Sequence, residues 1–287
     1  MLRTRIVWNL HDFCSGGCDY CPDMFKNGSI PQEFSMYMGV AKQLIDHYTS
    51  LGRTIDWIFN GGEPLEMFDL PELLKFCRIE NSTIRLITNG GKLWLDWWAL
   101  EPHINSLNLT VHHWQNFNLI RFIIQLFLRK NKDLNVSVPI RPTHFDEDIL
   151  TVEKIKNEFG IHVTKQMLYH HAVEEGGHIG YSNNQYENLT GIKISDTSRI
   201  TFKERSELIN NVSPIFQGQQ CNAGIEVLHI GHTGWVKGSM CNNTPLGNIW
   251  KGINLPVEPQ ICGMQSCVYP EDQKITKLDL CKCRTQD

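Results

Sequence analysis

Two patterns of apolar residues alternate along the first part of the chain. Short apolar runs of strand length occupy residues 3–10, 55–60, 84–88, 106–111, 135–140 and 161–166. Between them, apolar positions recur at helical spacing over residues 35–50, 70–77, 94–100, 117–128 and 145–159. Strands that alternate with helices predict parallel pairing with right-handed crossovers. The sequence therefore predicts an α/β fold with six strand–helix repeats.

Six repeats are too few to close a complete barrel, which needs eight. We therefore expect a partial (β/α)6 TIM-like barrel over residues 1–173. In such folds the chemistry lies at the carboxyl ends of the strands. From about residue 174 the alternation stops, and residues 174–197, rich in Gly, Asn and Ser, read as a loop or linker. Residues 198–287 are expected to form a second, smaller unit that contains many turns and six cysteines.

Composition narrows the class of protein. The 287 residues are 41% hydrophobic and 20% charged, with a formal net charge of −4. This balance argues against a large nucleic-acid interface, which needs a basic face. No apolar run is long enough to span a membrane, and no signal peptide is visible at the N-terminus. We therefore expect a cytoplasmic protein.

Nine of the ten cysteines are clustered, a usage typical of metal ligands in a reducing compartment. Cys77 stands apart within an apolar helical segment, so we assign it to the core. Cys14, Cys18 and Cys21 follow the first strand with the spacing C-x3-C-x2-C. The other six lie beyond residue 220: Cys221, Cys241, Cys262, Cys267, Cys281 and Cys283.

A glycine-rich turn follows the second strand, with the sequence Gly61-Gly62-Glu63-Pro64. A turn of this kind is common, but together with the Cys14–Cys21 loop it resembles the radical S-adenosylmethionine (radical SAM) superfamily. The resemblance implies that three thiolates bind three irons of a [4Fe–4S] cluster, and that S-adenosylmethionine binds the fourth. A zinc site is the alternative, although zinc usually takes paired cysteines and two further ligands.

The resemblance also implies roles for individual residues. The turn from Gly61 to Pro64 corresponds to the family's contact with the methionine amino group, and the Tyr20 segment approaches the adenine. Residues at other strand ends match positions that contact the ribose or methionine in family members; they are Asn89, Thr110, His112 and, for the methionine carboxylate, Arg141. For each of these four, a strand-end polar residue with a purely structural role is the alternative.

The C-terminal cysteines carry a second resemblance. This region is similar to the SPASM or twitch extension of radical SAM enzymes. The similarity lies in the segments Cys221-Asn-Ala-Gly224 and Pro245-Leu-Gly-Asn-Ile249-Trp250 and in the cysteines around them. That extension binds auxiliary [4Fe–4S] clusters. Six cysteines suffice for one cluster, with Cys221, Cys241, Cys262 and Cys267 as the first choice of ligands. Participation of Cys281 and Cys283, a second cluster and a zinc-bound module remain alternatives.

We therefore expect a radical SAM oxidoreductase that abstracts hydrogen from an unactivated C–H bond of a small molecule or a peptide residue. Its cofactors would be the S-adenosylmethionine-binding cluster, an auxiliary cluster and S-adenosylmethionine. The electron would come from an external donor of the flavodoxin or ferredoxin type. His112, Tyr169 and His170, at strand ends, are candidate catalytic residues. Modification of a nucleoside or nucleic-acid base, and a non-catalytic zinc-binding module, are the alternative functions.

Overall fold

The computed structural model describes most of the chain. The described residues are 2–21, 28, 33–91, 94–168, 180–191, 216–240, 245–264, 267, 272 and 274–278. Five predicted site residues lie outside these ranges: Tyr169, His170, Cys241, Cys281 and Cys283.

Up to residue 167, the part of the chain that the structure describes forms six strands and five α-helices in strict alternation. The strands are β1 (Leu2–Asn9), β2 (Arg53–Asn60), β3 (Thr83–Thr88), β4 (Ser106–Thr110), β5 (Asp133–Ile140) and β6 (Val163–Met167). The helices are α1 (Phe34–Ser50), α2 (Leu70–Cys77), α3 (Trp94–Leu100), α4 (Phe117–Arg129) and α5 (Phe145–Phe159). Short 3-10 helices, η2 (Pro64–Glu66), η3 (Glu101–His103) and η4 (Pro142–His144), lie at three of the connections.

The six strands pair in parallel and in chain order, which confirms the predicted partial barrel. Every element lies within two residues of its predicted ends. Glu33 occupies the N-terminal cap position of α1, with no capping bond from its side chain. Packing of Tyr37, Ala41 and Leu44 into the core stabilises the helix, so it does not require a side-chain cap.

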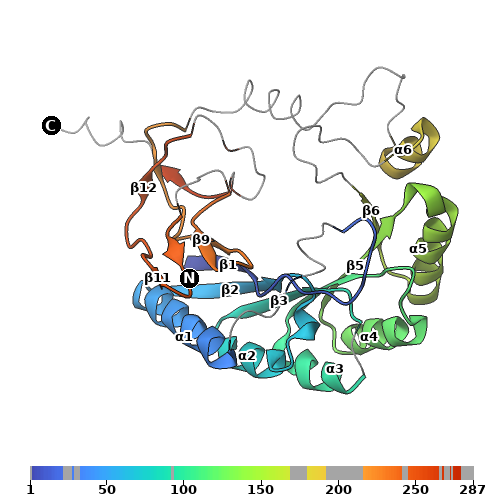
Figure 1. Ribbon diagram of the computed structural model, residues 1–287, viewed down its shortest axis with the longest axis horizontal. Coiled ribbons are helices and arrows are strands. Elements are labelled where there is room, and N and C mark those ends of the chain that lie inside the picture. The colour runs from blue at the N-terminus through green and yellow to red at the C-terminus, as the bar shows by residue number, and fades with distance from the viewer. Residues whose placement is uncertain are drawn as a thin grey trace.

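Helices α1 to α5 all cover one side of the curved sheet (Figure 1). Side chains on that side are fully buried, and the aromatic rings of Trp8, Trp57 and Phe59 pack against one another there. The alternate positions of the same strands, such as Asn9 and Asn60, point to the opposite, concave side and are only partly buried. Parallel strands are usually apolar on both faces. Here the concave face keeps polar side chains, so it is available for a ligand.

The sheet does not end at β1. Strand β8 (Val227–Ile230) pairs in parallel with β1, and β9 (Trp235–Lys237), β10 (Gly247–Asn248) and β11 (Gly252–Ile253) follow in antiparallel order. The result is one ten-stranded sheet. Buried hydrogen bonds tie the same region to the barrel: the Tyr48 hydroxyl donates to the Gly224 carbonyl at 2.6 Å, and the Thr4 hydroxyl donates to the Ile225 carbonyl at 2.6 Å.

The expected boundaries at 173/174 and 197/198 lie outside the described residues and stay predictions. The expected linker also contains a helix, α6 (Asn183–Thr190), which begins at a capping box between Ser182 and Gln185. Just before it, Tyr181 is buried, and its hydroxyl accepts a hydrogen bond from the Leu168 backbone at 3.0 Å. These contacts attach α6 to the end of the barrel.

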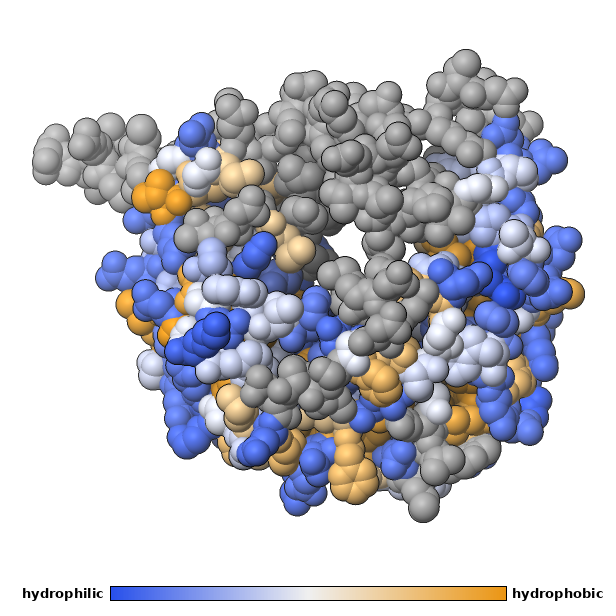
Figure 2. All heavy atoms as spheres, in the orientation of Figure 1, coloured by the Kyte–Doolittle hydropathy of each residue, from blue (hydrophilic) through white to orange (hydrophobic). Residues whose placement is uncertain are grey.

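A second, three-stranded sheet holds the cysteine-rich region. It consists of β7 (Gln220–Cys221) between β12 (Gln260–Ile261) and β13 (Lys277–Leu278), all antiparallel. The surface in Figure 2 is mostly hydrophilic over the described residues, with small, scattered apolar areas. None of the helices in the described ranges is long and apolar enough to cross a membrane.

The shared sheet predicts that residues 216–278 unfold together with the barrel. Leu228 in β8 is fully buried, so Leu228→Ala should cost about 2–5 kcal/mol. Urea denaturation followed by circular dichroism should show one transition, shifted as a whole. Leu278→Ala, at a leucine of β13 that is 47% exposed, is the control and should leave the midpoint nearly unchanged. Two transitions, of which only one moves, would show that the C-terminal region folds separately.

Candidate functional site

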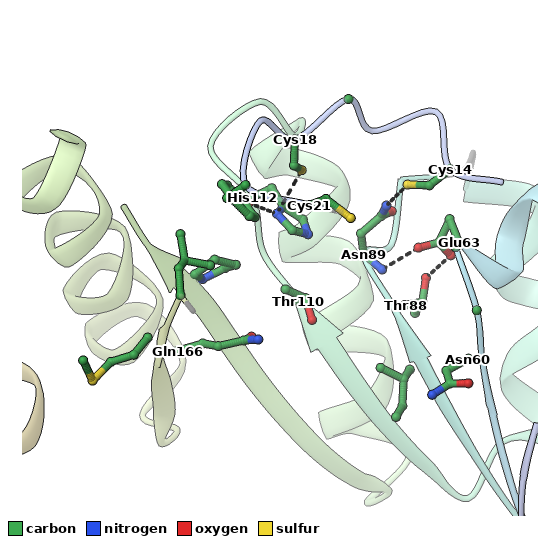
Figure 3. Close-up of a pocket in the computed structure, with 18 residues that line it drawn as sticks. Cys14, Cys18, Cys21, Asn60, Glu63, Thr88, Asn89, Thr110, His112 and Gln166 are labelled. Carbon is green, nitrogen blue, oxygen red and sulfur yellow. Dashed lines mark hydrogen bonds between the residues drawn. The ribbon is translucent and has the colours of Figure 1, made fainter. Parts of the chain in front are cut away.

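Three thiols line a cavity at the carboxyl ends of the strands. The cavity measures about 590 Å³, and Cys14, Cys18 and Cys21 form part of its wall (Figure 3). The cysteine loop directly follows β1 and lies above the ends of β2 to β4. Tyr20 of the same loop also lines the cavity, as do predicted site residues from other strand ends: Gly61, Gly62, Glu63, Asn89, Thr110 and His112. The structure therefore brings together in one cavity ten residues that the sequence predicted as one site.

The glycine turn supports the cysteine loop through its backbone. The N–H of Gly62 donates to the His11 carbonyl at 2.7 Å, and the N–H of Glu63 donates to the Phe13 carbonyl at 2.8 Å. A Cβ atom on Gly61 would lie 2.7 Å from the His11 oxygen, and one on Gly62 would lie 2.1 Å from the Phe13 oxygen. Both residues must therefore be glycine for the two backbones to approach this closely.

Glu63 fixes the turn to the next strand. Its buried carboxylate accepts hydrogen bonds from the Leu65 N–H at 3.0 Å, the Thr88 hydroxyl at 2.5 Å and the Asn89 N–H at 2.7 Å. Burial raises the pKa of Glu63 to about 7, although these three donors act in the opposite direction. Asn89 in turn places its side-chain amide 3.8 Å from the Cys14 sulfur. The ends of β2 and β3 are thus connected to the cysteine loop (Figure 3).

An aromatic stack covers the other side of the loop. The rings of Tyr20 and His112 stack with centroids 6.0 Å apart, and those of His112 and Trp114 with centroids 5.6 Å apart. The Trp114 indole N–H donates to the Cys18 sulfur at 3.3 Å, and the His112 Nδ1 lies 3.5 Å from the same sulfur. Burial lowers the pKa of His112 to about 4, so the imidazole is neutral at pH 7. Cys18 therefore lies against two nitrogen-bearing rings.

Sequence reasoning missed several contributors to the site. Trp114 is one of them, and Gln115 is another. The Gln115 side chain accepts a hydrogen bond from the His112 N–H at 2.6 Å and donates one to the Asn89 carbonyl. These two bonds join the ends of β3 and β4. Asn60 and Gln166 also line the cavity. Asn60 could have been predicted as a site residue, because it lies at the end of β2 directly before Gly61. Nothing in the sequence near Trp114 pointed to Cys18.

Two predicted residues do not line the cavity. The Arg141 guanidinium makes a buried ion pair with Asp148, with Nη2–Oδ1 at 2.7 Å and Nε–Oδ2 at 3.0 Å, and the Arg141 N–H donates to the same carboxylate. This bidentate pairing directs the guanidinium toward Asp148, and the role of Arg141 as a carboxylate ligand stays a prediction. Pro64 is buried as the first residue of η2 and shapes the turn rather than the cavity wall.

The C-terminal cysteines that the structure describes, Cys221, Cys262 and Cys267, are all buried. Cys221 in β7 and Cys262 after β12 belong to one buried cluster that also contains Ala223, Val227 and Ile275. Cys267 is 2% exposed. Within the described ranges, no three His, Cys, Asp or Glu side chains are grouped to hold one metal ion. Thiolates that each bind a different iron of a cluster do not require such a grouping.

Comparison with known proteins identifies the fold. No protein-family model matches the chain. A curated relative, Fe-coproporphyrin III synthase from Methanosarcina barkeri (strain Fusaro / DSM 804), is 35% identical over 88 residues, which are 31% of this chain and 21% of that protein. The chain thus spans about a fifth of the length of this relative.

Two solved structures match across most of the chain. Native anSMEcpe with bound AdoMet and Cp18Cys peptide superimposes with a TM-score of 0.53 and 17% identity, covering 88% of this chain and 79% of that chain. Native anSMEcpe with bound AdoMet gives 0.52, with the same identity and coverage. The chain has the radical SAM fold, and the resemblance to radical SAM enzymes predicted from the cysteine loop and the glycine turn is confirmed.

The close contact at the glycine turn predicts that a side chain at Gly62 destabilises the protein. Gly62→Ala places a methyl group against the Phe13 backbone, which cannot move without displacing the cysteine loop, so we expect a loss of about 1–3 kcal/mol. Gly39→Ala is the control, because Gly39 lies within α1 with open space around its Cα and should stabilise the protein by about 0.5–1 kcal/mol. Thermal unfolding measures both. Equal stability of Gly62→Ala and wild type would contradict the close approach.

Proposed function

We propose that this protein, which has the radical SAM fold, reductively cleaves S-adenosylmethionine and abstracts hydrogen from an unactivated C–H bond of its substrate. The observation that carries the proposal is the position of the three thiols. Cys14, Cys18 and Cys21 lie on one wall of the cavity, directly beside the Gly61–Glu63 turn. No fourth cysteine lines that cavity within the described residues. Three thiolates would bind three irons of a [4Fe–4S] cluster and leave one iron open.

The residues present fit such a cluster and its ligand. Thiolates are the usual ligands of iron–sulfur clusters, and they must be deprotonated to bind. Burial raises the pKa of the Cys14 thiol to about 11, so loss of this proton accompanies metal binding. The buried side-chain oxygen of Asn60 has no hydrogen-bond partner among the described residues, although Asn60 lines the cavity. An acceptor of this kind suits the amino or hydroxyl groups of S-adenosylmethionine.

We assign the remaining wall residues to the same ligand. The Gly61–Glu63 turn would hold the methionine amino group, and Glu63 keeps that turn fixed against β3. Asn89, Thr110 and His112 would contact the ribose and methionine, with Tyr20 beside the adenine. Bound to the cluster, S-adenosylmethionine supplies a 5′-deoxyadenosyl radical on one-electron reduction. The protein orients this ligand and the substrate and limits the access of water.

An auxiliary cluster is the second part of the proposal. Cys221 and Cys262 share one buried cluster of side chains, and Cys267 is also buried, which supports their joint use as ligands. Cys241 would be the fourth, and an auxiliary [4Fe–4S] cluster there would accept or transfer an electron. The electron for S-adenosylmethionine cleavage would come from an external flavodoxin or ferredoxin type of donor.

The substrate class is a small molecule or a peptide residue. The matched structure of anSMEcpe contains a peptide, and the curated relative is named for an iron coproporphyrin. Both support a substrate other than nucleic acid, in agreement with the formal net charge of −4.

Metal content and product formation test the proposal together. After anaerobic reconstitution, wild-type protein should hold about eight irons per chain and form 5′-deoxyadenosine from S-adenosylmethionine with dithionite. The triple variant Cys14→Ala/Cys18→Ala/Cys21→Ala should keep about four irons and form no 5′-deoxyadenosine. Cys77→Ala, at a core cysteine in α2, is the control and should retain both. Bound zinc without iron, and no 5′-deoxyadenosine from wild type, would overturn the proposal.

Trp114 offers a test that does not depend on turnover. Its N–H donates to the Cys18 sulfur, and such a bond stabilises the more electron-rich, reduced cluster. Trp114→Phe keeps an aromatic ring but removes the donor, so the reduction potential should become more negative in a titration monitored by electron paramagnetic resonance. Trp98→Phe, at an exposed tryptophan on α3, should leave it unchanged. A potential that is equal in the Trp114 variant and wild type would contradict this role.

A further inference from the structure

A second cavity lies beside the first on the concave face of the sheet. It measures about 490 Å³, within the range of small-molecule sites, and is formed mainly by β1, β8 and β9. Asn9 lines this cavity and Asn60 lines the cysteine cavity. Because Asn9 and Asn60 pair directly in β1 and β2, the two cavities meet at neighbouring strand ends. A ligand in the second cavity would therefore lie one strand away from the wall of the cysteine cavity.

The polar wall of this cavity is basic. His229 in β8 and Lys237 in β9 are directly opposite each other in the antiparallel pair, and both side chains line the cavity. None of the described lining residues is Asp or Glu. The Lys237 ammonium makes no hydrogen bond or ion pair with any residue that the structure describes. The described wall therefore presents the Lys237 ammonium without a carboxylate that neutralises it, and an anion that binds there would accept a charge-assisted hydrogen bond.

The rest of the wall is apolar. Trp235 in β9 is 50% exposed, and Met240, which follows β9, is 42% exposed. Val7 in β1 also lines the cavity. Exposed apolar side chains around a small number of polar groups are typical of a site that binds an organic ligand. The combination fits a molecule with an apolar body and one oxyanion group.

We propose that this cavity binds the substrate of the enzyme through a carboxylate or phosphate group. The oxyanion accepts hydrogen bonds from the Lys237 ammonium and the His229 imidazole, and the apolar body packs on Val7, Trp235 and Met240. The body then extends past Asn9 and Asn60 toward the Cys14–Cys21 loop. This inference rests on the proposed function and adds to it a substrate class and the residues that select it.

Binding of matched probes tests the inference without any turnover. The probes share a phenyl body: phenylpropanoate, phenethyl phosphate and the neutral phenylpropanamide. Their affinities for the reconstituted protein with S-adenosylmethionine are measured by ligand-detected nuclear magnetic resonance. We expect one anion or both to bind at least about tenfold more tightly than the amide. The stronger anion identifies which oxyanion the site takes.

Three variants locate the binding. Lys237→Met should reduce anion affinity about tenfold and leave the weak binding of the amide unchanged, whereas Lys237→Arg should retain most of the affinity. Lys251→Met removes the same charge from an exposed turn and should have no effect. Equal binding of the amide and the anions, no binding of either anion, or full anion affinity in Lys237→Met would each overturn the inference.

The two proposals fail in different ways. Formation of 5′-deoxyadenosine without anion binding at Lys237 would refute the substrate inference and leave the radical SAM function intact. Anion binding at Lys237 in a protein that holds no iron and forms no 5′-deoxyadenosine would refute the function and show that the cavity serves another reaction. Thermal unfolding of Lys237→Met should match wild type, since this side chain is partly exposed.

Discussion

The close approach of two backbones at the ends of β1 and β2 is the constraint on which the rest of the site depends. Beyond the last paired residues of these strands, three more hydrogen bonds continue the contact: Leu10 N–H to the Asn60 carbonyl, Gly62 N–H to the His11 carbonyl and Glu63 N–H to the Phe13 carbonyl. The loop that carries the cysteines is therefore an extension of the sheet. Its position is set by main-chain atoms, and only glycine leaves room for them at two positions of the turn.

Side chains then connect this contact to the neighbouring strands. Glu63 reaches the end of β3, and Gln115 joins the ends of β3 and β4. Each connection adds a strand end to one wall, so residues at the ends of β1 to β4 line the same cavity, to which β5 and β6 also contribute. On the convex side, large rings such as Trp8 and Trp57 are fully buried, so the strands that hold the wall are themselves firmly packed.

Local patterns predicted the elements well because each is encoded within a few residues. The strand runs and amphipathic helices of the barrel appear where their periodicity placed them, and the glycine turn and cysteine spacing were legible for the same reason. The pairing of β1 with β8 could not be read, since it joins residues more than two hundred positions apart and leaves no local signature. The hydrogen bond from Trp114 to Cys18 also joins residues far apart in the sequence and could not be predicted. The ion pair between Arg141 and Asp148 joins a strand end to the first turn of α5, and no sequence pattern pairs these two residues.

The central claim is that three thiolates hold a cluster whose fourth iron binds S-adenosylmethionine. Electron paramagnetic resonance of the dithionite-reduced protein, with and without S-adenosylmethionine, tests it most directly. Cys221→Ala/Cys262→Ala protein isolates the signal of the Cys14–Cys21 site from that of an auxiliary cluster. We predict a signal that changes shape when S-adenosylmethionine is added, because the ligand binds to iron itself. A cluster signal that S-adenosylmethionine leaves unchanged would show that no open iron exists, and would contradict the account.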